Sequence, residues 1–292
     1  MIKWGGTVYR LHPLFVLMML LSALTGYFLE LLTLFGVVLI HELGHVAAAR
    51  SFGWRIREVR LLPFGGVAIT DEGGNVPSRE ELIVALCGPL QNALLMGFAL
   101  AMQGMGLGDG NWWDYFFRAN LVIALFNLLP IYPLDGGKVL FVLLGQFVPY
   151  HRVLVLGTRL SLGLSALLTI GAAVPGMTGG LNLNMLAVGL FLLVTNWVGS
   201  RQILFHFYRY LMGKQASMQR EGAGRYRPIR RLDVGHKSTL LETSKLFMRD
   251  YHHLICIRGS QGGLERVVPE QALLQVFFDG QKTDRAVSEV FL

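Results

Sequence analysis

Long apolar runs separated by short polar connections fill the chain from its start to about residue 200. Runs with almost no charged side chain cover residues 14–28, 31–40, 90–102, 121–129, 153–174 and 185–198. A helix needs about 20 apolar residues to cross a hydrocarbon layer about 30 Å thick. The pattern therefore predicts a polytopic α-helical membrane protein with six transmembrane helices, at roughly residues 12–28, 31–52, 80–103, 114–148, 152–174 and 184–210.

The fourth of these segments differs from the others, because residues 114–148 are too many for one crossing. Pro130 and Pro133 lie in its middle, and proline lacks the amide hydrogen that an α-helix needs there. We predict a discontinuous fourth crossing, made of two half-helices joined by extended backbone. A simple proline kink is the alternative interpretation.

Composition excludes an ordinary soluble enzyme. The 292 residues are 53% apolar and 15% charged, whereas about a quarter of the residues in soluble proteins carry charge. Residues 1–215 carry 24 Lys, Arg, Asp and Glu side chains, and the much shorter segment 216–292 carries 21. We therefore expect a transmembrane domain at 1–215, a polar linker at 216–226 and a small soluble domain at 227–292.

The positions of the basic residues predict the orientation of the chain. The formal net charge is +7, and the basic side chains gather at four places: before the first predicted helix, between the second and third, between the fourth and fifth, and around the end of the sixth. The three opposite connections hold no Lys or Arg. Because positively charged loops stay in the cytoplasm, we predict that both termini are cytoplasmic. We expect no direct nucleic-acid binding.

A metal-binding pattern lies inside the second apolar run, at His41-Glu42-Leu43-Gly44-His45. Residues four apart share one face of a helix, so both imidazoles can reach one zinc ion while Glu42 can act as a general base on a water molecule. Ionisable groups at membrane depth cost about 2.5–3.5 kcal/mol each, so they need a reason. This cost weakens the alternative, which is a chance pattern with structural histidines.

A third ligand is needed, because a catalytic zinc site uses three protein ligands and leaves one position open. Asp135 lies between the two apolar half-helices, where a carboxylate would stay ionised beside a dication. We therefore predict that Asp135 is the third zinc ligand. Asp135 can also cap the half-helix that follows, and the two roles do not exclude each other.

Four motifs occur within the region of residues 35–140. H-E-L-G-H stands at 41–45, L-P-F-G-G at 62–66, C-G-P-L-Q-N at 87–92 and N-L-L-P-I-Y-P-L-D-G-G at 127–137. The first and last together resemble the double signature of the site-2 protease family of intramembrane zinc metalloproteases. The other two resemble that family's membrane-associated hairpin and its small-G-P-x-x-N segment.

The resemblance implies a role for eight residues. The zinc ligands would be His41, His45 and Asp135, the general base Glu42, and the substrate-binding residues Asn127, Pro133, Gly65 and Gly66. A transmembrane substrate has to unwind before its peptide bond is accessible, and an interrupted crossing would offer it unpaired backbone for strand addition. A tight turn is the alternative role for the two glycines.

The soluble segment has the pattern of a small α/β domain. Residues 238–249 and 269–278 have helical spacing, residues 254–257 and 267–268 are typical of strands, and residues 261–263 of a turn. This order resembles a single CBS module, so we expect a cytoplasmic CBS-like domain. CBS modules usually occur in pairs and often bind adenosine nucleotides, which implies a homo-oligomer and ATP or another adenosine nucleotide as ligand. A docking domain without a ligand is the alternative.

The early metal motif, the short distance between the two signatures and the CBS-like tail together resemble the sporulation members of the family. That resemblance implies that a membrane-associated sigma-factor precursor is cut to release the active transcription factor, and that inhibitory membrane proteins control the cut. It places the protein in a bacterial membrane, the mother-cell membrane around the forespore. The alternatives are a site-2 protease with another substrate, and a non-proteolytic zinc transporter or sensor. The predicted first, fifth and sixth helices are almost wholly apolar, which disfavours a transporter.

Overall fold

The structure is a computed structural model that describes residues 2–4, 7–11, 24, 26–54, 56–62, 65–70, 76–174, 183–220, 228–259, 263–279 and 284–291. The chain forms two compact units. The first contains Met1–Glu72, Arg79–Leu140 and Leu160–Asn196, and the second contains Gly73–Ser78, Phe141–Arg159 and Trp197–Leu292. Each unit is described by itself.

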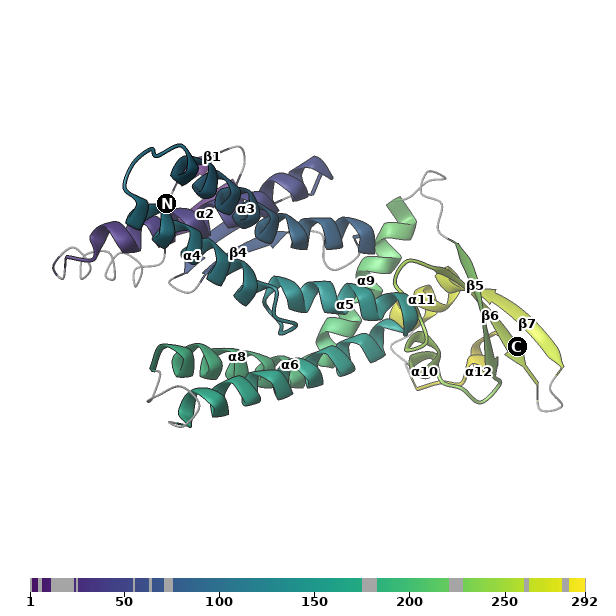
Figure 1. The fold of residues 1–292 in the computed structure, drawn as a ribbon. Coiled ribbons are helices and arrows are strands. Elements are labelled where there is room, and N and C mark those ends of the chain that lie inside the picture. The colour runs from purple at the N-terminus through teal and green to yellow at the C-terminus, as the bar shows by residue number, and fades with distance from the viewer. Residues whose placement is uncertain are drawn as a thin grey trace. The chain divides into compact units, whose positions relative to one another are not determined.

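Helices dominate the first unit (Figure 1). They are α2 (Phe28–Ser51), α3 (Ser78–Gly104), α4 (Gly110–Asn127), the start of α5 (Asp135–Phe147), most of α6 (Tyr150–Ala173) and most of α8 (Leu183–Arg201). In the part of the chain that the structure describes, four helices are long and apolar enough to cross a membrane, namely α2, α3, α6 and α8. This finding supports an integral membrane protein.

Most of the predicted crossings correspond to helices. Helices α2, α3 and α6 match the predictions at 31–52, 80–103 and 152–174 closely. The predicted crossing at 12–28 falls almost entirely outside the described residues. The prediction at 184–210 was wrong in its end, because α8 stops at Arg201 and a separate helix, α9 (Ile203–Arg220), begins two residues later. The six-helix count therefore stays a prediction.

The predicted break within residues 114–148 is present, whereas its place in a fourth membrane crossing stays a prediction. Helix α4 ends at Asn127 and α5 begins at Asp135, and both prolines of the motif lie in the segment between them. Proline supplies no amide hydrogen to a helix, so this segment leaves the helical path. The break carries the chain to Asp135, which opens α5.

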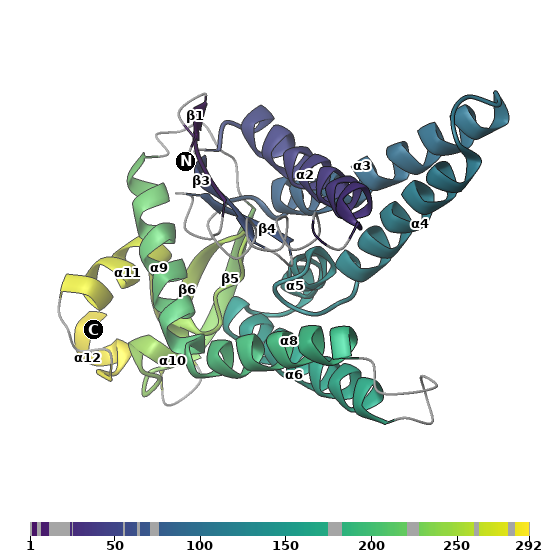
Figure 2. The same cartoon turned by 90° about the vertical axis from the view of Figure 1, so that its left-hand side faces the viewer.

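A four-stranded sheet accompanies α2 in the first unit. Its order is β1 (Ile2–Trp4), β2 (Thr7–Leu11), β3 (Ile56–Leu62) and β4 (Gly65–Thr70), with β2 and β3 parallel and the other two pairs antiparallel. Strands β3 and β4 pair antiparallel on either side of the expected hairpin at 62–66. The strands near the N-terminus were not predicted. Helix α2 contacts β4, and Figure 2 shows the two side by side. Among the described strands, β4 is at an edge of the sheet.

The second unit contains the tail domain. Strands β5 (Ile229–Gly235), β6 (His252–Arg258) and β7 (Leu264–Pro269) form a sheet with β6 in the centre, parallel to β5 and antiparallel to β7. The helices are α10 (Leu240–Ser244), α11 (Glu270–Asp279) and α12 (Val287–Phe291). The strands predicted at 254–257 and 267–268 and the helix predicted at 269–278 are present. The helix predicted at 238–249 is shorter, β5 was missed, and the predicted turn at 261–263 lies mostly outside the described residues.

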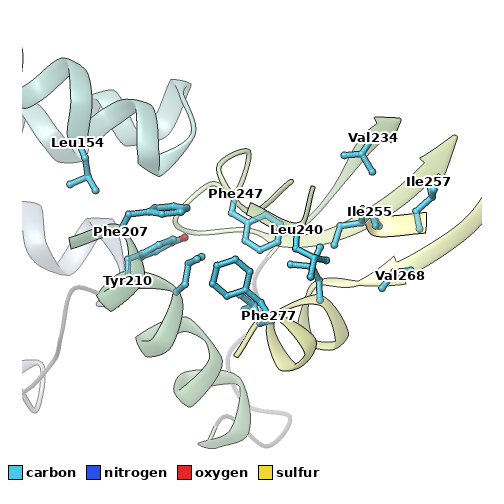
Figure 3. Packing of buried hydrophobic residues seen from close by; sticks show 14 residues of the cluster. Leu154, Phe207, Tyr210, Val234, Leu240, Phe247, Ile255, Ile257, Val268 and Phe277 are labelled. Carbon is cyan, nitrogen blue, oxygen red and sulfur yellow. The ribbon is translucent and has the colours of Figure 1, made fainter. Parts of the chain in front are cut away.

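Helix α9 belongs to the core of this unit. Its Phe207 and Tyr210 are fully buried and lie with Phe247 and Phe277 of the tail in one apolar cluster (Figure 3). Because this burial stabilises the helix, α9 continues to Arg220. Helix α9 includes residues 216–220 of the predicted linker and residues 221–226 lie outside the described residues, so the linker at 216–226 stays a prediction.

A buried polar cluster fastens α9 to the tail. The ammonium of Lys214, which is 0% exposed, lies 3.0 Å from Glu270 Oε1 and donates to the Tyr251 carbonyl at 2.9 Å. The other carboxylate oxygen of Glu270 contacts His253 Nδ1, and His253 Nε2 accepts the Met248 N–H at 3.1 Å. This arrangement requires neutral His253, in agreement with burial, which lowers its pKa. Burial alone would raise the pKa of Glu270, but the bond to His253 and the charge of Lys214 hold it below its ordinary value.

Candidate metal centre

Helix α2 places His41 and His45 on one buried face, one turn apart. Their Nε2 atoms lie 3.2 Å from each other. Asp135, at the start of α5, directs Oδ2 at both atoms, 3.1 Å from that of His41 and 2.9 Å from that of His45. One ligand atom from each of the three residues therefore meets at one buried point, which could hold a metal ion. The sequence prediction that these residues converge is confirmed.

Two buried amides orient the His41 ring. His41 Nδ1 lies 2.5 Å from Asn92 Oδ1, and Asn92 Nδ2 donates to Asn120 Oδ1 at 3.0 Å. Asn120 in turn donates to the Phe116 carbonyl at 2.8 Å. Because Asn92 presents an acceptor oxygen, His41 has to donate from Nδ1, which leaves a lone pair on Nε2. A ring fixed in this tautomer by a neighbouring acceptor is characteristic of metal-binding histidines.

The His45 ring is held in the same tautomer by α3. Its Nδ1 lies 2.7 Å from the Val84 carbonyl, which can only accept a hydrogen bond. In their neutral form, both histidines therefore turn an unprotonated Nε2 toward Asp135 Oδ2. Three lone pairs about 3 Å apart repel one another unless a cation lies between them, so the donor set fits a dication. Two imidazole nitrogens and one carboxylate oxygen are a catalytic zinc set.

Gly88 of α3 makes room for this centre. A Cβ at position 88 would lie 2.3 Å from His45 Nε2 and 2.7 Å from His41 Nε2. Any side chain there would overlap the ligand atoms, so the absence of one keeps the space beside the Nε2 atoms free. The backbone of α3 thus forms one wall of the centre.

Lys138 contacts the other oxygen of Asp135. Its ammonium donates to Asp135 Oδ1 at 2.9 Å, one turn along α5, while Oδ2 faces the histidines. One carboxylate oxygen of Asp135 therefore binds a cation on its own helix, and the other faces the metal position. Glu42 follows His41 on α2, is partly buried and lies within electrostatic range of the Lys138 ammonium.

The four expected substrate-binding residues occupy separate places. Asn127 ends α4 and donates to the Ile123 carbonyl at 3.0 Å, and Pro133 is partly buried in the break. Gly65 and Gly66 open β4, where they pair with the last residues of β3. The structure places both glycines on an edge strand, which goes beyond the tight turn considered from sequence.

The expectation of unpaired backbone in the break was wrong. Ile131 N–H donates to the Leu129 carbonyl at 2.7 Å and Leu134 N–H to the Ile131 carbonyl at 2.9 Å. The N–H of Tyr132 donates to Ser161 of α6, and its carbonyl accepts from Asn196 of α8. Unsatisfied backbone groups are very costly in a membrane, which is the physical reason for this pairing.

Sequence reasoning missed several residues around the centre. They are Val84, Gly88, Asn92, Asn120 and Lys138. Asn92 and Gly88 lie in a motif that was recognised but received no role. Buried amides within apolar runs, such as Asn92 and Asn120, were an available signal, because a polar side chain in a membrane helix needs a partner.

The chain resembles known proteins over most of its length. A profile of peptidase family M50 matches residues 29–110 and 105–168. Stage IV sporulation protein FB of Bacillus subtilis is 32% identical over 294 residues, which are 99% of each chain. The chain belongs to peptidase family M50, the site-2 protease family. It is therefore a zinc metalloprotease of the site-2 type.

Two further relatives of this M50 peptidase agree with that assignment. Zinc metalloprotease MJ0392 of Methanocaldococcus jannaschii is 29% identical over 161 residues, which are 54% of this chain and 45% of the relative. The solved structure of a site-2 protease from the same organism is similar with a TM-score of 0.53 and 26% identity, covering 68% of this chain and 94% of that one.

Proposed function

We propose that this M50 peptidase hydrolyses a peptide bond in a membrane-associated precursor, at a zinc ion held by His41, His45 and Asp135. The convergence of their three ligand atoms at one buried point carries the proposal. The orientation of both rings by acceptors on Nδ1 supports it, because this leaves both Nε2 atoms free to bind the metal.

Glu42 is the proposed general base. It neighbours His41 on α2, and its carboxylate would take a proton from the attacking water and pass it to the leaving amine. Zinc, when bound, supplies a Lewis acid that polarises the scissile carbonyl and lowers the pKa of water. Lys138 would keep Asp135 ionised and leave Oδ2 for the metal position.

The edge of β4 is the proposed docking strand for the substrate. Because the backbone of the break is already paired, an extended substrate needs another strand to add to, and β4 lies at a sheet edge beside α2. Gly65 and Gly66 have no side chains to obstruct that approach. Asn127 at the end of α4 and Pro133 in the break would contact the substrate.

The proposed substrate is the membrane-associated precursor of a sporulation sigma factor. The relative that spans 99% of this chain is a sporulation protein, which supports this choice. Inhibitory membrane proteins would restrain the enzyme until the factor is needed. Both termini would face the cytoplasm, in the mother-cell membrane around the forespore.

The tail domain is a proposed regulatory module. Its elements follow the order β5, α10, β6, β7, α11, a β-α-β-β-α arrangement that agrees with the CBS-like prediction. A single module would pair with that of a second chain, so we propose a homo-oligomer, with ATP or another adenosine nucleotide as ligand.

The test is coexpression of the full chain with a membrane-associated sigma-factor precursor, followed by immunoblotting for the shortened product and zinc analysis of the purified enzyme. Glu42→Gln should abolish cleavage and keep zinc, whereas His45→Ala should lose both. Glu30→Gln is the matched control, because this carboxylate is exposed in the first turn of the same helix. Cleavage by Glu42→Gln would refute the proposed base, and loss of zinc in that variant would make Glu42 a structural residue.

A further inference from the structure

Two buried polar side chains of α6 and α8 contact the break between α4 and α5. Hydroxyls in apolar helices usually bond to the carbonyl one turn earlier, as Ser165, Thr169 and Thr195 do here. Ser161 and Asn196, which are 0% and 1% exposed, also form a hydrogen bond with the backbone of the break. Helices α6 and α8 lie side by side in Figures 1 and 2.

Both side chains meet the same residue. Ser161 Oγ accepts the Tyr132 N–H at 3.0 Å, and Asn196 Nδ2 donates to the Tyr132 carbonyl at 2.6 Å. The amide of Asn196 also donates to the Leu192 carbonyl at 2.9 Å, so it is anchored to α8. The backbone of Tyr132 is thus held from both of its polar groups, three residues before Asp135.

The break is in turn packed against the first turn of α5. A Cβ at Gly136 would lie 2.1 Å from the Leu128 carbonyl oxygen, and one at Gly137 would lie 2.5 Å from the Tyr132 backbone nitrogen. Backbone at such close approach cannot slide, so the position of the break fixes the start of α5. The start of α5 is Asp135 itself.

We infer that Asn196 and Ser161 are positioning residues that set Asp135 Oδ2 at the metal position through the backbone of Tyr132. The inference rests on the proposed function, because it takes His41, His45 and Asp135 as the metal ligands. Metal–ligand bonds tolerate displacements of only about 0.2 Å. Release of the break would therefore weaken metal binding although neither residue touches the metal position.

The experiment measures zinc affinity of the full-length protein in detergent by competition with a chelator, together with the visible absorption spectrum of the cobalt-substituted protein. Asn196→Leu and Ser161→Ala should each weaken zinc binding by about 10- to 100-fold and change the cobalt spectrum. Thr195→Val is the matched control, because it removes a polar group from the adjacent position, where Thr195 bonds only within its own helix in the described contacts. This control should keep the wild-type affinity and spectrum.

The outcomes separate the inference from the proposed function. Wild-type affinity and spectrum in both variants, with loss of zinc in Asp135→Ala, would overturn the inference alone. Undiminished zinc binding by Asp135→Ala would overturn the proposed metal centre. If Asn196→Leu fails to fold, Ser161→Ala decides, since it removes one oxygen atom. An equal loss of zinc affinity in Thr195→Val would also defeat the inference. Removal of any polar side chain from these helices would then weaken zinc binding.

Discussion

Gly88→Ala should disable the metal centre by adding a single carbon atom. That atom would lie 2.3 Å from His45 Nε2 and 2.7 Å from His41 Nε2, whereas an ordinary contact needs at least 3.4 Å. The His45 ring would have to retreat by about 1 Å, which is several times the displacement of about 0.2 Å that a metal–ligand bond tolerates. We expect zinc affinity to fall at least about 100-fold, which corresponds to about 2.7 kcal/mol.

The assay is zinc content of the purified protein after equilibration with graded chelator, with precursor cleavage measured in parallel. Gly97→Ala is the matched control, because it lies on the same helix and its added carbon would meet no atom within 4 Å. That variant should keep zinc and cleavage, and alanine's higher helix propensity should leave stability unchanged or raise it by up to about 1 kcal/mol. Full zinc occupancy and normal cleavage in Gly88→Ala would refute the steric argument.

Three more predictions concern buried polar groups. Asn120→Leu should weaken zinc binding about 10-fold in a chelator titration, because it removes the acceptor that orients Asn92; unchanged affinity would show that Asn92 needs no support. Lys214→Met should destabilise the folded protein by about 3–5 kcal/mol in thermal or denaturant unfolding, because the Glu270 carboxylate stays buried without its cation. Adding Glu270→Gln should recover part of this loss, and no recovery would contradict the ion-pair explanation. Burial lowers the pKa of His253, whereas a histidine in the unfolded chain titrates near 6.5, so the tail should lose stability as pH falls below about 6.5. The measurement is hydrogen exchange of the β6 amides, corrected for the intrinsic effect of pH on exchange. Protection that stays constant below about pH 6.5 would refute this prediction.

The local chemistry of the metal centre was readable from sequence. His41, Glu42 and His45 needed only helical periodicity to share a face, and two prolines in an apolar run were enough to predict the break before Asp135. These inferences depend on residues near one another in the chain, where covalent geometry fixes the relation between them.

The supporting residues of the centre, the sheet and the helix boundaries depended on which segments pack together. A buried amide such as Asn92, Asn120 or Asn196 can face any neighbouring helix, and its apolar sequence surroundings do not indicate which one. The N-terminal strands join the sheet only because β2 pairs with β3, which lies about 50 residues further along the chain. Helix α9 likewise begins shortly before Phe207, which is buried in the core of the tail domain. Sequence alone thus determined the candidate ligands and the interrupted helix. Tertiary packing decided how those side chains are oriented, because their supporting hydrogen bonds join residues far apart in the chain.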